Sequence, residues 1–326
     1  MQTQMREICL INWGLLSDAS YLYGVDLEFL KDGRVSFHQE FLPIGTVIHT
    51  WLSDVNYQDR RDIPRLPLLK RGQDYCLKLN LETVKGHQPY LRLTFFNRRK
   101  EVVGHKIIKE DTAEFSLPKD CYSYKIDLIN AGSQSFVFDS ILLYAKEMED
   151  HLNQSYFVLP SLDDNVKNAS LKVFLLENQE GQVMPFTEYY LKKVGPSFIF
   201  GLTKLDQLAY LTDTFVDYVA KAIHKHAPEA LDQGIQFIGT GPKSDRVAIL
   251  LENAFEKGSS SHTDPVTFDQ ELTANIDQSE LALEWLKELL QNNSSNATSE
   301  TEQQNEDSLV EGLLAKNKLL AQFQEK

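Results

Sequence analysis

Hydrophobic residues alternate with polar ones through the first half of the chain, from about residue 24 to residue 146. In the run "YCLKLNLE", Tyr75, Leu77, Leu79 and Leu81 occupy every second position, which places them on one face of a strand. Turn residues such as Gly, Asn, Asp and Pro separate successive runs. Eight or nine short strands without a helical period predict an antiparallel β-sandwich or jelly roll over residues 1–148. The inward positions expected on the later strands are Leu91, Leu93, Phe95, Tyr124, Ile126, Leu128, Phe136, Phe138, Ile141 and Leu143.

The pattern changes after about residue 150. Apolar runs such as "LKVFLL" and "SFIFGL" indicate buried strands, and Phe215, Val219 and Ile223 recur at helical spacing. The strand "GIQFIG" is followed by a helix expected behind Ser244 and Asp245, which are candidates for its cap. Strands alternating with helices predict a small α/β segment over residues 155–258, so the whole chain is expected to be an α+β multidomain protein.

Residues 259–326 are expected to form a linker, an amphipathic helix, a disordered acidic stretch and a terminal helix. The linker is "KGSSSHTDP", and from His262 onward the chain has 13 Asp and Glu against 4 Lys and Arg. The terminal helix begins at Ser308 with a capping box to Glu311. It is either a solvated appendage or a tethered helix that docks in the groove of a partner. Its apolar stripe consists of Leu309, Leu313, Leu314, Leu320 and Phe323.

The overall charge of the 326-residue chain excludes some functions. A net charge of −14 argues against nucleic-acid binding, which needs a basic face. The basic run "NRRKEVVGHK" is therefore interpreted as a solvated turn. Three widely spaced cysteines without a CxxC motif argue against a disulfide framework or a zinc site, and we expect no cofactor or metal.

No apolar run approaches the ~20 residues that a membrane-spanning helix needs, and the N-terminus has no signal-peptide pattern. The expected location is the cytoplasm, and a peripheral position at the inner face of the membrane is compatible with it.

The strongest candidate for enzymatic chemistry is "FIGTGPKSD". Gly239, Gly241 and Ser244 follow a strand and precede a helix, but the third glycine of a dinucleotide fingerprint and the elbow serine of a hydrolase are missing. We favour a tight strand-to-helix turn without chemistry and expect no catalytic residue. The alternative is a carbohydrate-active esterase or hydrolase with a fused binding module, in which Ser244 would act.

A second candidate site lies in the segment that begins with the run "GTVIHTW". Aromatic faces with Arg and Asp side chains bind sugars, and Trp51, Tyr57, Asp59, Arg60 and Arg61 provide that chemistry beside a sheet. In the alternative interpretation, Trp51 fills the core and the arginines pair with neighbouring aspartates.

Several motifs, in the same order, resemble those of accessory secretory protein 3 of the accessory Sec system of Gram-positive bacteria. They cover residues 10–146, a little under half of the chain, and the order of the later strands also resembles carbohydrate-binding jelly rolls. The motifs are "YLYG", "FLPIGTVIHTW", "NYQ", "PRLPLLKRGQDY", "TFFNRR" and "YSYKIDLINAG".

The resemblance implies a non-enzymatic sandwich protein that assembles with two sister accessory secretory proteins. Together with a dedicated Sec motor ATPase, such a complex exports serine-rich repeat glycoproteins, which are adhesins, and its members are credited with binding N-acetylglucosamine. The chain departs from short family members through residues 155–326, whose role the resemblance does not cover. A third possibility is a structural adaptor that binds no ligand.

Overall fold

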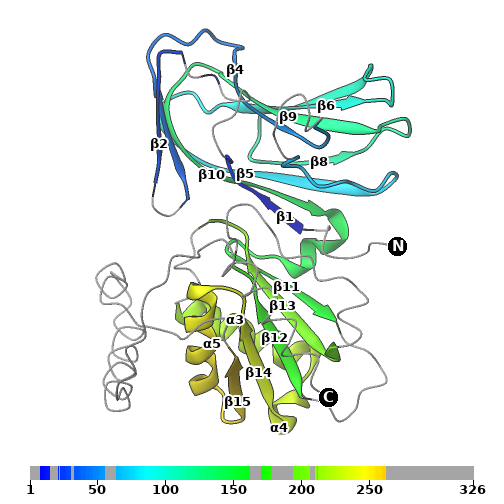
Figure 1. Cartoon of the computed structure of the whole chain (residues 1–326), viewed down its shortest axis with the longest axis vertical. Coiled ribbons are helices and arrows are strands. Elements are labelled where there is room, and N and C mark those ends of the chain that lie inside the picture. Colours follow the sequence, from blue (N-terminus) through cyan, green and yellow to red (C-terminus); the bar gives the residue numbers. More distant parts are fainter. Residues whose placement is uncertain are drawn as a thin grey trace, which may run out of the picture. The chain divides into compact units, whose positions relative to one another are not determined.

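The computed structural model describes residues 8–14, 21, 23–30, 33–55, 64–161, 170–177, 194–205, 210 and 212–261. Contacts between residues divide them into two units, each of which is described by itself. Unit 1 holds the described residues up to Ser155 together with residues 203–205, and unit 2 holds the others. Most strands and helices of both units are labelled in Figure 1.

Unit 1 is an antiparallel β-sandwich, as the alternation predicted. Its six-stranded sheet has the order β2-β3-β10-β5-β8, with β1 also paired to β10, and its four-stranded sheet has the order β4-β9-β6-β7. A short 3-10 helix, η1, follows β10 at Lys146–His151. The strands are β1 (Ile8–Ile11), β2 (Val25–Phe29), β3 (Val35–Gln39), β4 (Val47–Leu52), β5 (Asp74–Gly86), β6 (Tyr90–Phe96), β7 (Val102–Ile108), β8 (Thr112–Ser116), β9 (Ser123–Ile129) and β10 (Ser133–Ala145).

One hydrophobic core joins the two sheets, and every inward position named above for β6, β9 and β10 is buried in it. In β10 the inward residues change parity, from Phe136 and Phe138 to Ile141 and Leu143. The pairing of β10 with β5 shifts its register between Phe138 and Ser140. This irregularity takes up one residue, so both pairs of side chains face the core.

The interpretation of "NRRKEVVGHK" as a solvated turn is wrong for its second half, because Val102–Ile108 form β7. The turn itself ends at Lys100, which has a positive φ of 64°. The side-chain oxygen of Asn97 accepts hydrogen bonds from the main-chain N–H groups of Arg99 (2.8 Å) and Glu101 (3.0 Å). These bonds close the turn locally and let the chain return as a strand.

Unit 2 is an α/β structure, as expected. Its sheet has the order β11-β13-β12-β14-β15, in which only the β11–β13 pair is antiparallel. Helices α3 and α5 pack in the same hydrophobic cluster and so cover one face of this sheet (Figure 1). The elements are β11 (Tyr156–Ser161), β12 (Leu171–Leu175), β13 (Ser197–Leu202), α3 (Asp213–His226), α4 (Ala230–Gln233), β14 (Ile235–Gly239), α5 (Pro242–Ala254) and β15 (Gly258–Ser261).

Two boundaries in unit 2 differ from those predicted. The linker predicted at "KGSSSHTDP" starts before the end of the folded unit, because Gly258–Ser261 form β15, which pairs in parallel with β14. A Cβ at Gly258 would lie 2.7 Å from Glu252 O, so the glycine permits this close packing. Helix α5 begins at Pro242, before Ser244, because proline suits the first helical position, where no N–H is needed. The amphipathic and terminal helices predicted beyond residue 261 lie outside the described residues.

Candidate interaction surfaces

Trp51 is the one proposed sugar-binding residue that the structure describes, and the prediction is wrong for it. Strand β4 directs its side chain between the sheets, where it is 0% exposed. The indole N–H donates to Asn12 O (2.8 Å), and the ring stacks on Phe138 with centroids 5.5 Å apart. Trp51 therefore fills the core. Tyr57, Asp59, Arg60 and Arg61 lie outside the described residues, so their role stays a prediction.

A buried histidine lies beside this tryptophan. The His49 ring is 4.6 Å from the ring of Trp13 and 4.5 Å from that of Trp51, measured between centroids. Burial among these rings, with a smaller contribution from the nearby positive charge of Arg65, lowers the pKa of His49 to about 3. His49 is therefore a neutral structural residue at neutral pH.

The outer face of the four-stranded sheet carries a buried carboxylate held by two cations. Asp127 is 0% exposed. Its Oδ2 is 2.9 Å from Arg92 Nη2 and 3.0 Å from Lys125 Nζ, and its Oδ1 accepts from Thr50 Oγ1 at 2.9 Å. The register of β4, β9 and β6 brings these side chains together. The side chains of Arg92 and Lys125 are partly exposed and retain N–H donors for hydroxyl or carbonyl oxygens. Tyr90 lies two residues before Arg92 and therefore on the same face of β6.

The large apolar residues of unit 1 with the highest exposed fractions lie at one end of the β2–β3 hairpin. Tyr23 is 86% exposed, Phe41 is 88% exposed and Ile44 is 76% exposed. The register of β2 and β3 places Tyr23, just before β2, at the same end as Phe41, just after β3. We call these three residues the apolar loop patch. Exposed aromatic and branched side chains gathered in this way are typical of protein interfaces.

The β3–β4 loop, which carries Phe41 and Ile44 of this patch, is held by one buried amide, Asn130. Its Nδ2 donates to Leu42 O (2.8 Å) and Pro43 O (3.1 Å). Its Oδ1 accepts from the N–H groups of Gly132 (2.9 Å) and Ser133 (2.8 Å). All four side-chain hydrogen-bonding positions of Asn130 are thus used, and the β3–β4 loop is ordered before any partner binds.

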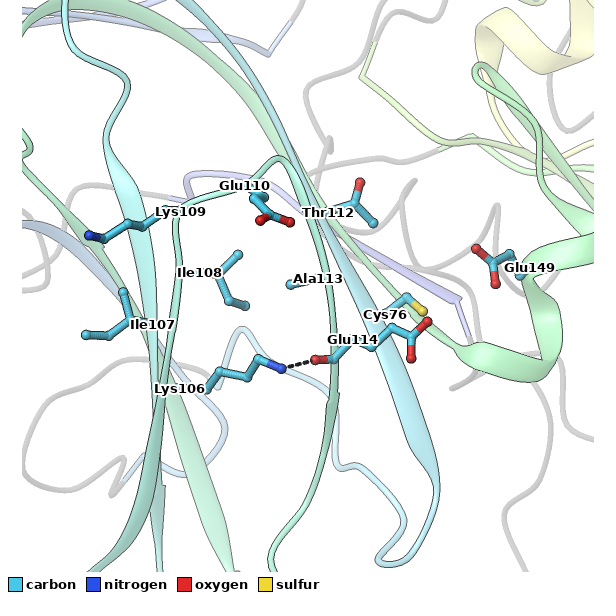
Figure 2. A pocket seen from close by; sticks show the side chains of 10 residues that line it. All are labelled: Cys76, Lys106, Ile107, Ile108, Lys109, Glu110, Thr112, Ala113, Glu114 and Glu149. Atoms are coloured by element: carbon cyan, nitrogen blue, oxygen red, sulfur yellow. Dashed lines mark hydrogen bonds between the residues drawn. The ribbon is translucent and has the colours of Figure 1, made fainter.

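A hollow of about 740 Å³ separates the edge strands β7 and β8. Figure 2 shows Lys106 and Ile108 of β7 directed toward β8, whereas Ile107 and Lys109 are directed away from it. The ammonium of Lys106 donates to the main-chain oxygen of Glu114 across the hollow. The residues that line it are Cys76, Lys106, Ile107, Ile108, Lys109, Glu110, Thr112, Ala113, Glu114 and Glu149.

Ser244, the nucleophile of the alternative enzymatic interpretation, is fully buried and bonded as a structural residue. Its Oγ accepts from the N–H groups of Thr240 (2.8 Å) and Gly241 (2.9 Å), and donates to Gly241 O (3.0 Å). A catalytic serine instead donates its proton to a base. The geometry therefore favours the tight turn that the sequence suggested.

The same turn receives a carboxylate from the chain itself. Glu177 follows β12, and its Oε2 accepts from Ser244 N (2.8 Å) in the first turn of α5. Its own N–H donates to Thr240 Oγ1 (2.9 Å), just after β14. The chain passes from β12 to β13 on one side of the sheet order and from β14 to β15 on the other side. Open α/β sheets usually bind ligands between two such strands, beyond their carboxyl ends. Here the side chain of Glu177 takes the place that a ligand anion would occupy.

Within the described ranges, no cluster of three or more potential metal ligands occurs, and no helix is long and apolar enough to cross a bilayer. Cys9, Cys76 and Cys121 are free thiols. Cys76 is buried, as the strand pattern predicted, and burial raises the pKa of its thiol.

Comparison with known proteins places the sandwich in a known family. Residues 20–145 match the family model described as accessory Sec secretory system, accessory secretory protein 3. A relative of that name from Streptococcus gordonii is 37% identical over 137 residues, which are 39% of this chain and 86% of the relative. One from Staphylococcus aureus is 27% identical over 168 residues, 51% of this chain and 52% of that protein.

A crystal structure of accessory secretory proteins 1, 2 and 3 in Streptococcus pneumoniae contains a similar chain. That chain is 34% identical, and the match covers 44% of this chain and 99% of that one with a TM-score of 0.40.

Proposed function

The chain belongs to the accessory secretory protein 3 family of the accessory Sec system, and we propose that it is a non-enzymatic, cytoplasmic subunit of the export complex. In this proposal it assembles with two sister accessory secretory proteins. The assembly hands a glycosylated serine-rich repeat adhesin to the dedicated Sec motor ATPase. The observation that carries the proposal is the 37% identity along 86% of the S. gordonii relative, and the family model matches residues 20–145, which belong to unit 1.

Two features of the structure support a binding role. The apolar loop patch exposes Tyr23, Phe41 and Ile44, and Asn130 orders in advance the loop that carries Phe41 and Ile44, so little conformational entropy is lost when a partner covers that loop. Ser244 is committed to structural hydrogen bonds, which argues against the esterase or hydrolase alternative.

Co-purification with the sister proteins tests the assembly. We expect the wild-type chain, co-expressed with them, to elute as one complex. The double substitution Phe41→Asp and Ile44→Asp should weaken the complex at least about tenfold, because it introduces charge at the centre of an apolar contact. Leu68→Asp is the matched control, since Leu68 is 58% exposed and also apolar. A wild-type chain that elutes alone contradicts the proposed function.

Weak binding of N-acetylglucosamine by this subunit is the finer part of the proposal. Two places offer the chemistry: the outer sheet face around Tyr90, Arg92 and Lys125, and the segment with Tyr57 and Arg60. We expect free N-acetylglucosamine to shift the NMR resonances of the residues at one of these two places. Tyr90→Ala should abolish binding if the sheet face is the site, and Tyr57→Ala if the segment is. Equal binding by both folded variants would exclude the two places together.

A further inference from the structure

Four strand edges of the sandwich are unpaired within the described part of the chain: those of β2, β7 and β8, and that of β1, which has only 4 residues. The fifth edge, that of β4, is covered, because Ile48 O and Leu52 O accept from the N–H groups of Tyr21 and Leu66. A free edge presents a row of main-chain N–H and C=O groups, and the group that matches such a row is another extended chain.

The free edges differ in how well they are protected. Strand β2 has exposed acidic residues, Asp26 and Glu28, and β8 has Glu114, whose main-chain oxygen is bonded by Lys106. Strand β7 is longer than either of these and exposes β-branched apolar residues. Val102 is 59% exposed and Ile107 is 50% exposed. Strand β7 also carries a charge, but Lys106 is directed toward β8 and bonded there, whereas Val102 and Ile107 leave exposed apolar surface. Because exposed apolar side chains favour strand pairing, β7 is the edge best suited to a partner strand.

The register shows which main-chain groups of β7 point outward. Asn97 faces β7, because its N–H donates to Glu101 O (2.9 Å). The direction of the main-chain N–H and C=O groups alternates along β6, so Leu93, four residues before Asn97, also bonds toward β7. Lys106 is the partner of Leu93, and its main-chain groups therefore bond inward, to β6. His105 and Ile107 flank Lys106 and therefore direct their N–H and C=O groups to the free edge. Figure 2 shows the hollow beside this edge, which leaves room for side chains of an added strand.

The charges beside β7 indicate the composition of that strand. Lys106 makes no ion pair with a described carboxylate, because its ammonium bonds only the neutral carbonyl of Glu114. Lys100 and Lys109 flank the strand, but each has an exposed glutamate next to it, Glu101 and Glu110, so Lys106 is the cation that an added strand would meet. An added strand with carboxylates opposite Lys106 and apolar side chains beside Ile107 would complement both features.

We propose that the free edge of β7 accepts an extended, acidic and apolar strand from a sister accessory secretory protein. The strand pairs with the outward main-chain groups of His105 and Ile107 and adds a fifth strand to the four-stranded sheet. This inference rests on the proposed function, since the sister proteins supply the strand.

The test uses the complex of the full chain with both sister proteins. Ile107→Pro removes one outward N–H, leaves the inward bonds of β7 in place and should weaken the complex at least about tenfold. Ser116→Pro makes the same change at the outer edge of β8 and should leave the affinity unchanged. Thermal melting checks that both variants are folded.

Amide hydrogen exchange on the wild-type chain gives an answer even if Ile107→Pro fails to fold. The amides of His105 and Ile107 should exchange at least about tenfold more slowly in the complex than in the free chain. If the wild-type chain does not assemble, the proposed function fails. If it assembles while these amides remain unprotected, or while folded Ile107→Pro binds normally, only the strand addition is overturned.

Discussion

A single histidine makes the sandwich sensitive to acid. His49 is 2% exposed and lies against the rings of Trp13 and Trp51. Its pKa is lowered from 6.5 to about 3 by burial. The unfolded chain therefore takes up a proton below about pH 6.5 that the folded chain takes up only near pH 3. The stability that depends on neutral His49 is fully present above about pH 6.5 and is lost as the pH falls from there toward 3.

We predict that the free energy of unfolding of unit 1 falls by about 2 kcal/mol between pH 7.5 and pH 5 because of His49, since each pH unit below 6.5 contributes about 1.4 kcal/mol. His49→Gln should be less stable at every pH but should lack this part of the pH dependence. Urea unfolding at the two pH values measures it. His38→Gln, at an exposed position, is the control. A wild-type slope retained in His49→Gln would contradict the assignment.

Asn130 is buried, but it fixes the conformation of the loop that exposes Phe41 and Ile44. It is 0% exposed, yet its four side-chain hydrogen bonds join the β3–β4 loop to the turn after β9. The sequence could not reveal this, because "LINAG" is also an ordinary turn motif. The exposed Phe41 and Ile44 were likewise not singled out, since isolated apolar residues in a loop carry no periodic signal.

At the scale of elements, helix α5 depends on a cap from a distant strand. The carboxylate of Glu177 bonds the N–H of Ser244 in the first turn of α5, where its charge also favours the positive end of the helix. Ser244 itself bonds the preceding turn. The sequence correctly suggested a strand-to-helix turn here, but it could not pair Glu177 with a residue 67 positions further on.

We predict that Glu177→Ala lowers the free energy of unfolding of unit 2 by about 1 kcal/mol, the usual effect of removing a helix cap. Glu177→Gln should recover part of this, because its amide oxygen still accepts the bond but lacks the charge. Chemical denaturation followed by circular dichroism measures the change. Glu256→Ala removes an exposed carboxylate from the same unit and should have little effect. Equal stability of Glu177→Ala and wild type would show that this cap contributes nothing.

Strands with clean alternation were predictable and those without it were not. Leu91, Leu93 and Phe95 predicted β6, and even the change of parity in β10 is visible in the sequence. Strands β7 and β8 expose most of their residues, so their sequences resemble solvated turns. Strand β15 consists of one glycine and three serines, and only its pairing with β14 makes it a strand.

At the scale of the whole molecule, the two-part organisation follows from two hydrophobic cores, one between the two sheets of unit 1 and one against the single sheet of unit 2. The change from a period of two to a mixed period near residue 150 revealed both parts in the sequence. Trp51 was misassigned because a tryptophan near a polar loop is equally suited to a sugar and to a core. Packing against Phe138 and the bond to Asn12 O decide between the two, and both depend on contacts that are remote in the chain.

The burial of Trp13 and Trp51 in one core gives the sandwich an intrinsic optical probe. The chain has three tryptophans, two of which lie in unit 1 and none among the described residues of unit 2. Water reaches these two indoles only when the sheets separate, so a red shift of their emission reports the opening of unit 1. Mixing and quenching experiments can thus follow the sandwich without any attached dye.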